Sequence, residues 1–117
     1  MNEELNNFMA TKVMEWNNDN GEFWEDEKGY FKYYFTYERS VIYEGKYWHP
    51  ATDTGQAIIC ATKYCDDNIC VLSTQYDPTR KLWWADITDG NDGIDGESNK
   101  DNLSLAICEA IKQAVEK

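Results

Sequence analysis

The chain has 117 residues, with 22 acidic and 11 basic side chains, a formal net charge of −11 and 15% aromatic residues. This length fits one domain, over residues 1–117, with a core large enough to stand alone. The negative charge repels nucleic acids and anionic membranes at long range. It therefore excludes a general nucleic-acid binder and favours either plain solubility or a basic protein partner.

No segment of the sequence indicates export or membrane insertion. The first four residues carry two glutamates and no basic side chain, unlike a signal peptide. No run approaches the roughly 20 apolar residues needed to cross a bilayer. We therefore expect a cytoplasmic protein whose four cysteines are reduced thiols.

The amino-terminal third predicts one helix and then strands. Apolar residues recur at helical spacing from about Glu3 to Trp16, while Lys12 and Glu15 fall off this stripe. Residues 22–28 are expected to form an acidic loop. Aromatic residues on both alternating sets of residues 29–37 predict a strand covered on both faces, beside which residues 40–43 can pair. The helical stripe consists of Leu5, Phe8, Met9, Val13 and Trp16.

Residues 47–64 are expected to form the element around which the others pack. Pro50 disfavours helical geometry at His49, so the entry is extended or turn-like. Thr52 or Asp53 can cap the helix that follows, and Asp53 with Gln56 resembles a capping box. Residues 57–61 are apolar without a break. This pattern predicts a central helix that is largely covered.

The carboxyl-terminal half predicts a hairpin and a last helix. Two β-rich runs, 69–76 and 81–88, are joined by residues 77–80, and the adjacent Trp83 and Trp84 should point to opposite faces. Residues 89–99 are rich in Gly, Asp and Asn and are expected to form a mobile loop. Asp101 or Asn102 can cap the last helix, whose stripe contains Leu103, Ile107, Ala110, Ile111 and Ala114.

The order helix, strands, helix, hairpin, helix predicts the fold class. Helices interspersed with antiparallel strands favour layers on both faces of a sheet. We therefore expect a single-domain α/β fold, an α/β/α sandwich with three helices and a mainly antiparallel sheet.

Three blocks, one in each expected helix, resemble the phage ABA-sandwich domain family. They are FMATKVMEW at residues 8–16, WHPATDTGQA at 48–57 and LAICEAI at 105–111. The resemblance implies a tailed-phage or prophage origin and an α/β/α sandwich. It implies little chemistry, because the family is mostly without assigned activity and has no catalytic motif. Ala51 stands where the family usually has a capping Ser, and the 89–99 loop is longer and more acidic than usual.

Catalysis and metal binding find little support in the residue pattern. His49 is the only histidine, and nothing in the spacing pairs it with a nucleophile, which favours a packed or capping role. Cys60, Cys65 and Cys70 lack the short paired spacing of a zinc site and are expected to be structural thiols. The acidic residues of the 89–99 loop depart from the EF-hand template, whose Gly stands at the sixth position. We expect no enzyme, no metal and no cofactor.

An aromatic cluster ahead of the central helix is the candidate ligand site. Stacking surfaces beside free helix amides are what a nucleotide requires, and Gly55 would let a ligand approach the first turn. The two arginines would supply phosphate contacts if they face the same cleft, although the carboxylate of Asp53 competes with phosphate there. The predicted ligand-binding residues are Arg39, Tyr43, Tyr47, Trp48, His49, Arg80 and Trp84.

Two binding functions remain open. The first is a phage accessory protein that counters host defence by sequestering a nucleotide-derived immune signal in the aromatic cleft, either within one chain or at the interface of a homo-oligomer. The alternative is an acidic inhibitor whose residues 22–27 and 89–101 occupy the basic nucleic-acid groove of a host protein. Only the second complex should weaken steeply with salt. An enzyme that depends on His49 is the third class.

Overall fold

The computed structural model describes residues 3–15, 22–25, 31–34, 49–89 and 93–117. Its helices are α1 (Glu3–Phe8), which continues as the π-helical turn η1 (Met9–Val13), α2 (Thr54–Asn68) and α3 (Leu103–Glu116). Its strands are β1 (Glu22–Glu25), β2 (Phe31–Tyr34), β3 (Cys70–Asp77), β4 (Leu82–Asp89) and β5 (Ile94–Lys100).

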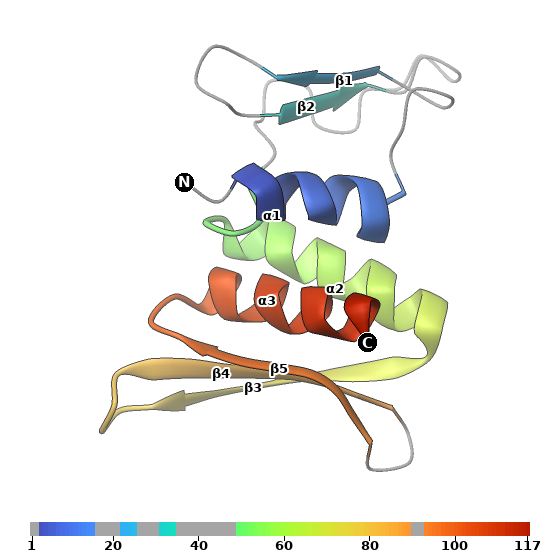
Figure 1. Ribbon diagram of the computed structural model, residues 1–117. Coiled ribbons are helices and arrows are strands. Elements are labelled where there is room, and N and C mark those ends of the chain that lie inside the picture. The colour runs from blue at the N-terminus through green and yellow to red at the C-terminus, as the bar shows by residue number, and fades with distance from the viewer. Residues whose placement is uncertain (1–2, 16–21, 26–30, 35–48, 90–92) are drawn as a thin grey trace.

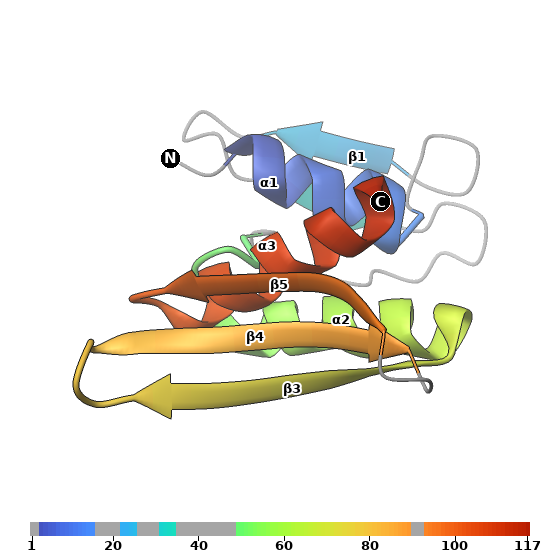
Figure 2. The ribbon, with the colours of Figure 1, turned by 60° about the horizontal axis from the view of Figure 1, so that its bottom comes forward.

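The described elements form stacked layers. β3, β4 and β5 make an antiparallel sheet in that order, and α2 and α3 cover one of its faces (Figure 1). α1 lies on the far side of these two helices, and the separate antiparallel pair β1–β2 lies beyond α1. The predicted fold class is confirmed: one α/β sandwich domain with three helices and antiparallel strands. The layer order differs from expectation, because the three helices lie on the same side of the three-stranded sheet (Figure 2).

All three helices run in the same direction. In both ribbon views α1, α2 and α3 begin at one end of the molecule and finish at the other (Figures 1 and 2). Between α2 and α3 this follows from the three antiparallel strands β3, β4 and β5, an odd number that returns the chain to the starting end. The macrodipoles of the helices are therefore aligned, with their negative ends together.

The predicted stripe of α1 is confirmed where the structure describes it. Leu5, Met9 and Val13 are buried, while Lys12 and Glu15 are exposed. The helix closes through a π-type bond in which the Met14 amide donates to the Met9 carbonyl at 2.9 Å.

α2 is a helix as predicted, but the expectation that it is largely covered is wrong. Ile58 and Ile59 are 42% and 40% exposed, and the buried face of α2 is limited to Gln56, Ala57, Cys60 and Ala61. The reason is its position, since it packs on α3, β3 and η1 along one side only. The unbroken apolar run of residues 57–61 therefore does not identify the central helix.

α3 occupies the centre instead. It contacts α1, α2, β4 and β5, and seven of its residues are buried. Asn102 caps it, accepting a hydrogen bond from the Leu105 amide at 3.2 Å, which confirms one of the two predicted caps. The buried residues are Ser104, Ala106, Ile107, Cys108, Ala110, Ile111 and Ala114.

The predicted hairpin is confirmed as β3 and β4. The Asp77 carboxylate closes its loop by accepting from the amides of Thr79 and Arg80, at 2.9 and 3.3 Å. Trp83 packs against the core and lies opposite Tyr76, with ring centroids 5.0 Å apart. Trp84 alternates to the opposite face, as predicted.

The prediction of a loop over residues 89–99 is wrong, because residues 94–100 form β5 on the edge of the sheet. Gly96 and Ser98 are buried and pair with Ile87 and Ala85 of β4. A Cβ atom on Gly96 would lie 2.0 Å from the Ala110 carbonyl oxygen, so α3 packs directly on the strand backbone. In the sequence, Gly96 suggests a loop. In the structure, a glycine is required at this position because α3 approaches the strand backbone so closely.

The acidic loop predicted over residues 22–28 is also corrected, because residues 22–25 form β1. β1 pairs with β2, which lies within the predicted strand of residues 29–37; residues 29–30 and 35–37 lie outside the described residues. The predicted strand at residues 40–43 lies outside the described residues. Among the described residues, no helix has the length and apolar content that a membrane span requires.

Gly96→Ala is expected to lower the free energy of unfolding by about 3 kcal/mol, because the new methyl group overlaps the α3 backbone. Chemical denaturation measures the loss. Gly55→Ala is the matched control, since an added Cβ there meets only the Asp53 carboxylate at 3.2 Å and should cost little. Equal stability of the two variants would contradict the close packing of α3 on β5.

Candidate functional site

Three of the seven predicted ligand-binding residues lie in the described chain, namely His49, Arg80 and Trp84. Arg39, Tyr43, Tyr47 and Trp48 lie outside the described residues. The aromatic cleft as a whole therefore stays a prediction.

His49 takes part in the turn that leads into α2. Its carbonyl accepts hydrogen bonds from the amides of Thr52 and Asp53, and its ring Nδ1 lies 2.9 Å from the Thr52 hydroxyl. Asp53 caps α2 by accepting from the Gln56 amide at 3.0 Å. The Gln56 side chain does not complete a capping box, because it accepts from the His49 amide at 2.7 Å instead. His49 thus closes the turn that precedes α2, while the cap itself is Asp53.

The same turn is tied to the other two helices at Ala51. The Ala51 amide donates to the Asn6 side-chain oxygen of α1, and its carbonyl accepts from the Ser104 hydroxyl of α3, each at 3.0 Å. Ala51 and Ser104 are buried almost completely, and Asn6 is 7% exposed. The segment that the sequence singled out thus joins the starting ends of all three helices.

Arg80 and Trp84 lie on different parts of the sheet. Arg80 belongs to the β3–β4 loop, is about two-thirds exposed and lies 3.9 Å from the Asp77 carboxylate. Trp84 lines a cavity of about 310 Å³ with Asn99 of β5 and Gln113 of α3 among its neighbours. Neither His49 nor Arg80 lines this cavity.

The four cysteines are free thiols, and two of them are sealed in the core. Burial raises the pKa of Cys108 to about 12, with Glu109 as a smaller cause. Burial, followed by the neighbouring Cys108, also raises the pKa of Cys60 well above its ordinary value. A thiol needs a lowered pKa to act as a nucleophile, so these two are suited to packing. No group of three metal-binding side chains occurs among the described residues.

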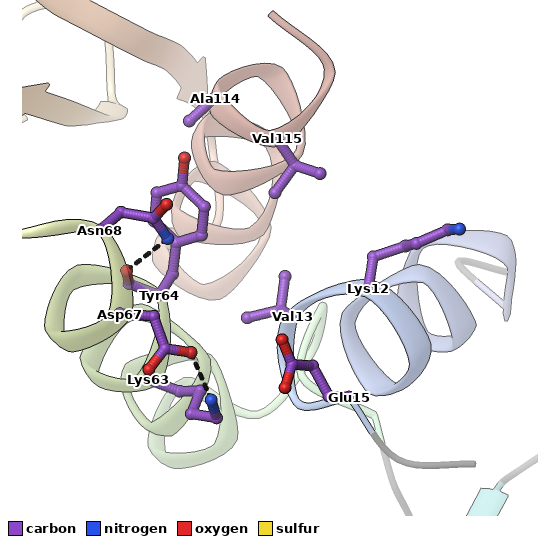
Figure 3. A pocket seen from close by; sticks show the side chains of 9 residues that line it. All are labelled: Lys12, Val13, Glu15, Lys63, Tyr64, Asp67, Asn68, Ala114 and Val115. Carbon is purple, nitrogen blue, oxygen red and sulfur yellow. Dashed lines mark hydrogen bonds and ion pairs between the residues drawn. The ribbon is translucent and has the colours of Figure 1, made fainter.

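A cavity that the sequence did not indicate opens between the finishing ends of the three helices (Figure 3). Its volume is about 690 Å³. In Figure 3, Val13 and Val115 point into the space between the helices, and the Tyr64 ring lies between α2 and α3. We call this cavity the helix-end cleft. It is lined by Lys12, Val13, Glu15, Lys63, Tyr64, Asp67, Asn68, Ala114 and Val115.

The charged side chains that line the helix-end cleft are two lysines and two carboxylates, Lys12, Glu15, Lys63 and Asp67. Lys63 forms an ion pair with Asp67. The hydrogen bond to Asp67 is the main cause that raises the pKa of Lys63, and Glu15 and Asp66 add to it. Three carboxylates thus act on one ammonium group. The amino group of Lys12 points away from Lys63 (Figure 3).

The helix backbones contribute negative electrostatic potential at the end of the molecule where the helices finish. Each helix C-terminus carries about half a negative charge on its free carbonyls. Neither α2 nor α3 has a basic residue in its last turn to offset it. Glu15, just beyond η1, has a φ of 60°, a left-handed conformation that costs a non-glycine residue about 1 kcal/mol. Glu15 therefore occupies this position although the negative helix end repels its carboxylate and its left-handed backbone conformation is unfavourable.

One interaction beside the helix-end cleft has a signal in the sequence, although the cleft itself has none. Lys63 and Asp67 stand four residues apart, the spacing of a helical ion pair. Asp66 and Asp67 belong to the last turn of α2, which ends at Asn68. Only the parallel arrangement of the helices brings Glu15 to the same place.

Comparison with known proteins finds no match to this chain among protein-family models, curated proteins or solved structures. The resemblance to the phage ABA-sandwich domain family therefore stays a prediction from three sequence blocks.

Asn6→Ala is expected to lower the free energy of unfolding by about 2 kcal/mol, because it leaves the buried Ala51 amide without its acceptor. Hydrogen exchange of that amide should accelerate at the same time. Asn7→Ala is the matched control, since Asn7 is exposed and its substitution should change stability by less than about 0.5 kcal/mol. Equal losses in both variants would contradict the anchoring role of Asn6.

Alkaline pH is expected to destabilise the protein through Cys108. The unfolded thiol loses its proton near pH 9, whereas the folded one keeps it to about pH 12. The unfolded state therefore binds fewer protons in this window, and the free energy of unfolding falls as pH rises, by about 1.4 kcal/mol per pH unit. In Cys108→Ala the slope should be smaller by that amount. Loss of side-chain volume alone would shift the whole curve, so parallel curves would contradict the prediction.

Proposed function

We propose that this chain is a non-catalytic binding protein that engages a basic partner through its acidic helix end. The observation that carries the proposal is that Glu15, Asp66, Asp67 and Glu116 stand in or just after the last turns of the three helices, which finish at the same end of the molecule (Figure 1). We call these four residues the acidic end. Of the four, only Asp67 forms an ion pair within the described part of the chain.

Electrostatics supports a binding role for the acidic end over a structural one. Lysine or arginine at a helix C-terminus stabilises a protein by about 0.3–1 kcal/mol, and an acidic residue there has the opposite effect. Asp66 and Glu116 are exposed, so no packing requirement explains them. A negative patch on a chain of charge −11 attracts a basic surface at long range and speeds association.

The resemblance of three helix blocks to a phage family supplies the context of the proposal. In this context the chain is a phage accessory protein that acts in the cytoplasm of an infected bacterium. Its partner is a host defence protein whose basic groove otherwise holds nucleic acid. The acidic end occupies the groove in place of the phosphates of the nucleic acid. The partner is therefore blocked without any reaction catalysed by this chain.

Sequestration of a nucleotide-derived immune signal is the second candidate function. It is favoured by the aromatic surplus and by Trp84, which is only half-buried and lines a cavity at β5. It is opposed by Asp53, whose carboxylate occupies the first turn of α2, where a phosphate would bind. Calorimetric titration with cyclic and ADP-ribose-type nucleotides tests this candidate, and uptake of one of them by the wild-type chain would favour it over the first.

The basic-partner proposal is tested by capture from a bacterial lysate, followed by binding measurements on the purified partner. We expect a basic protein that is released between 50 and 500 mM salt and that competing DNA displaces, because charge contacts are screened within about 10 Å at 0.1 M salt. Retention at high salt, or indifference to DNA, would contradict the proposal.

Charge-reversal variants distinguish the contribution of the acidic end to binding from that of the net charge of the chain. Asp66→Lys with Glu116→Lys should weaken binding at least tenfold, yet raise the free energy of unfolding by about 1 kcal/mol through the helix dipoles. Glu4→Lys with Glu97→Lys is the matched control, because it changes the net charge equally at exposed positions away from the acidic end. Equal weakening by both pairs would show that only net charge matters.

A further inference from the structure

We infer that β3 pairs with β3 of a second copy of this chain, so that two three-stranded sheets join edge to edge in a symmetric dimer. The two α2 helices then lie side by side on the same face of the joined sheet. This inference goes beyond the proposed function, because the partner is another copy of the chain and not a basic protein.

The two edge strands of the three-stranded sheet are protected to different degrees. An open edge presents unpaired backbone amides and carbonyls, which proteins usually block with charges, bulges or covering groups. On β5, the Gln113 side chain accepts from the Glu97 amide at 3.3 Å, and the Lys117 ammonium donates to the Ile94 carbonyl at 3.2 Å. The register between β4 and β5 is also interrupted by a bulge. The β5 edge is therefore guarded against pairing with another strand.

β3, which forms the other edge of the sheet, has none of these features (Figure 2). It pairs with β4 in an unbroken register of eight residues, and no described element pairs with its other side. From Cys70 to Tyr76 it contains no charged residue, glycine or proline. Alternate residues of an antiparallel strand direct both backbone groups to the same side, so about half of the β3 residues face the open edge. These groups are suited to bind another extended strand.

Exposed apolar side chains are concentrated on the same flank of the molecule. Six large hydrophobic side chains are exposed in the described part of the chain, and five of them belong to α2, to β3 or to the residue between the two. These five are Ile58, Ile59, Ile69, Val71 and Tyr76. On the helix-facing side of the sheet, Ile87 of β4 is completely buried, whereas its β3 partner Leu72 is only partly buried. The layer of helices therefore stops short of β3.

A groove of about 250 Å³ lies between α2 and β3. It is lined by Ile58, Ala61, Thr62, Cys65, Asp66 and Leu72. Asp66, in the last turn of α2, is the charged member of this set. A strand added at the β3 edge places alternate side chains on the helix side of the sheet, beside this groove. The groove therefore extends the surface that an added strand would contact.

A second copy of the chain satisfies both the open strand and the exposed helix. Two antiparallel β3 strands are related by a two-fold axis perpendicular to the sheet, and two-fold symmetry is the commonest in protein dimers. The same axis brings α2 of the second copy, with its own exposed isoleucines, next to Ile58 and Ile59. An extended peptide would pair with the strand but would provide no helix to cover these side chains.

The strand contact is extensive enough to support a dimer. Pairing over the eight residues of β3 supplies about eight backbone hydrogen bonds, close to the roughly ten direct bonds of a typical interface. Burial of Ile58 and Ile59 from both copies adds an apolar region beside these bonds. The contact therefore combines strand pairing with helix packing.

Electrostatics is compatible with this contact. The chain has a net charge of −11, yet β3 is uncharged from Cys70 to Tyr76. The two-fold axis makes the α2 helices antiparallel, so the negative end of each lies toward the positive end of the other. The opposed helix dipoles offset part of the repulsion between two acidic chains. The same symmetry places the two acidic ends at opposite ends of the dimer.

Sedimentation equilibrium of the full chain over a range of protein concentrations tests the inference. We expect the mass to rise with concentration from 13.7 kDa to twice that value. Added salt should not dissociate the dimer, because screening weakens the repulsion between the two acidic chains. Hydrogen exchange should slow in residues 70–77 as the dimer forms and stay unchanged in residues 94–100.

Thr74→Lys should raise the Kd of the dimer at least tenfold, because Thr74 is exposed in the middle of β3 and a charge there opposes edge pairing. Asn99→Lys is the matched control. It makes the same charge change at an exposed position of β5, the other edge strand, and should change the Kd less than twofold. Ile58→Gln leaves β3 unchanged and should raise the Kd at least threefold, which tests the contact independently of the strand.

A monomer at every concentration would overturn the inference. Equal weakening by Thr74→Lys and Asn99→Lys would also overturn it, since the contact would then not be specific to the β3 edge. Growth beyond two copies would have the same consequence, because a symmetric β3 contact is complete in the dimer.

Discussion

Two buried hydrogen bonds on the backbone of Ala51 organise this protein. The Ala51 amide donates to Asn6 of α1 and its carbonyl accepts from Ser104 of α3, so the turn before α2 is attached to both neighbouring helices. Because these polar groups are buried, each needs its partner, and the bonds specify which helix ends meet. The three helices start together for this reason and, being parallel, finish together.

The parallel arrangement has an electrostatic consequence that antiparallel helices avoid. Three negative helix ends converge, and the chain places Glu15, Asp66, Asp67 and Glu116 there, next to Lys12 of η1 and Lys117 after α3. Acidic residues at these helix ends are unfavourable for folding, but they can attract a positively charged partner. Local rules are most often broken at functional sites, which is why the binding proposal is located at this end.

The three-stranded sheet supports this arrangement from one side. α3 lies close enough to β5 that Gly96 meets the backbone at Ala110, which brings the central helix down onto the sheet. α2 is consequently displaced to one flank, and its residues Ile58 and Ile59 remain partly exposed. Trp84 alternates with the core-facing Trp83, and the face of the sheet opposite the helices is covered by no described element (Figure 2).

Local sequence patterns were sufficient to predict the three helices and the β3–β4 hairpin, because helical stripes, caps and the turn at Asp77 each involve residues that are close in the sequence. The cap at Asp53 is local for the same reason. β5 could not be recognised, since Gly96 and Ser98 acquire their strand character only through pairing with β4 and contact with α3. The helix-end cleft could not be predicted either, because its charges belong to separate helices. Their proximity depends on the relative direction of those helices, which is a property of the tertiary structure alone.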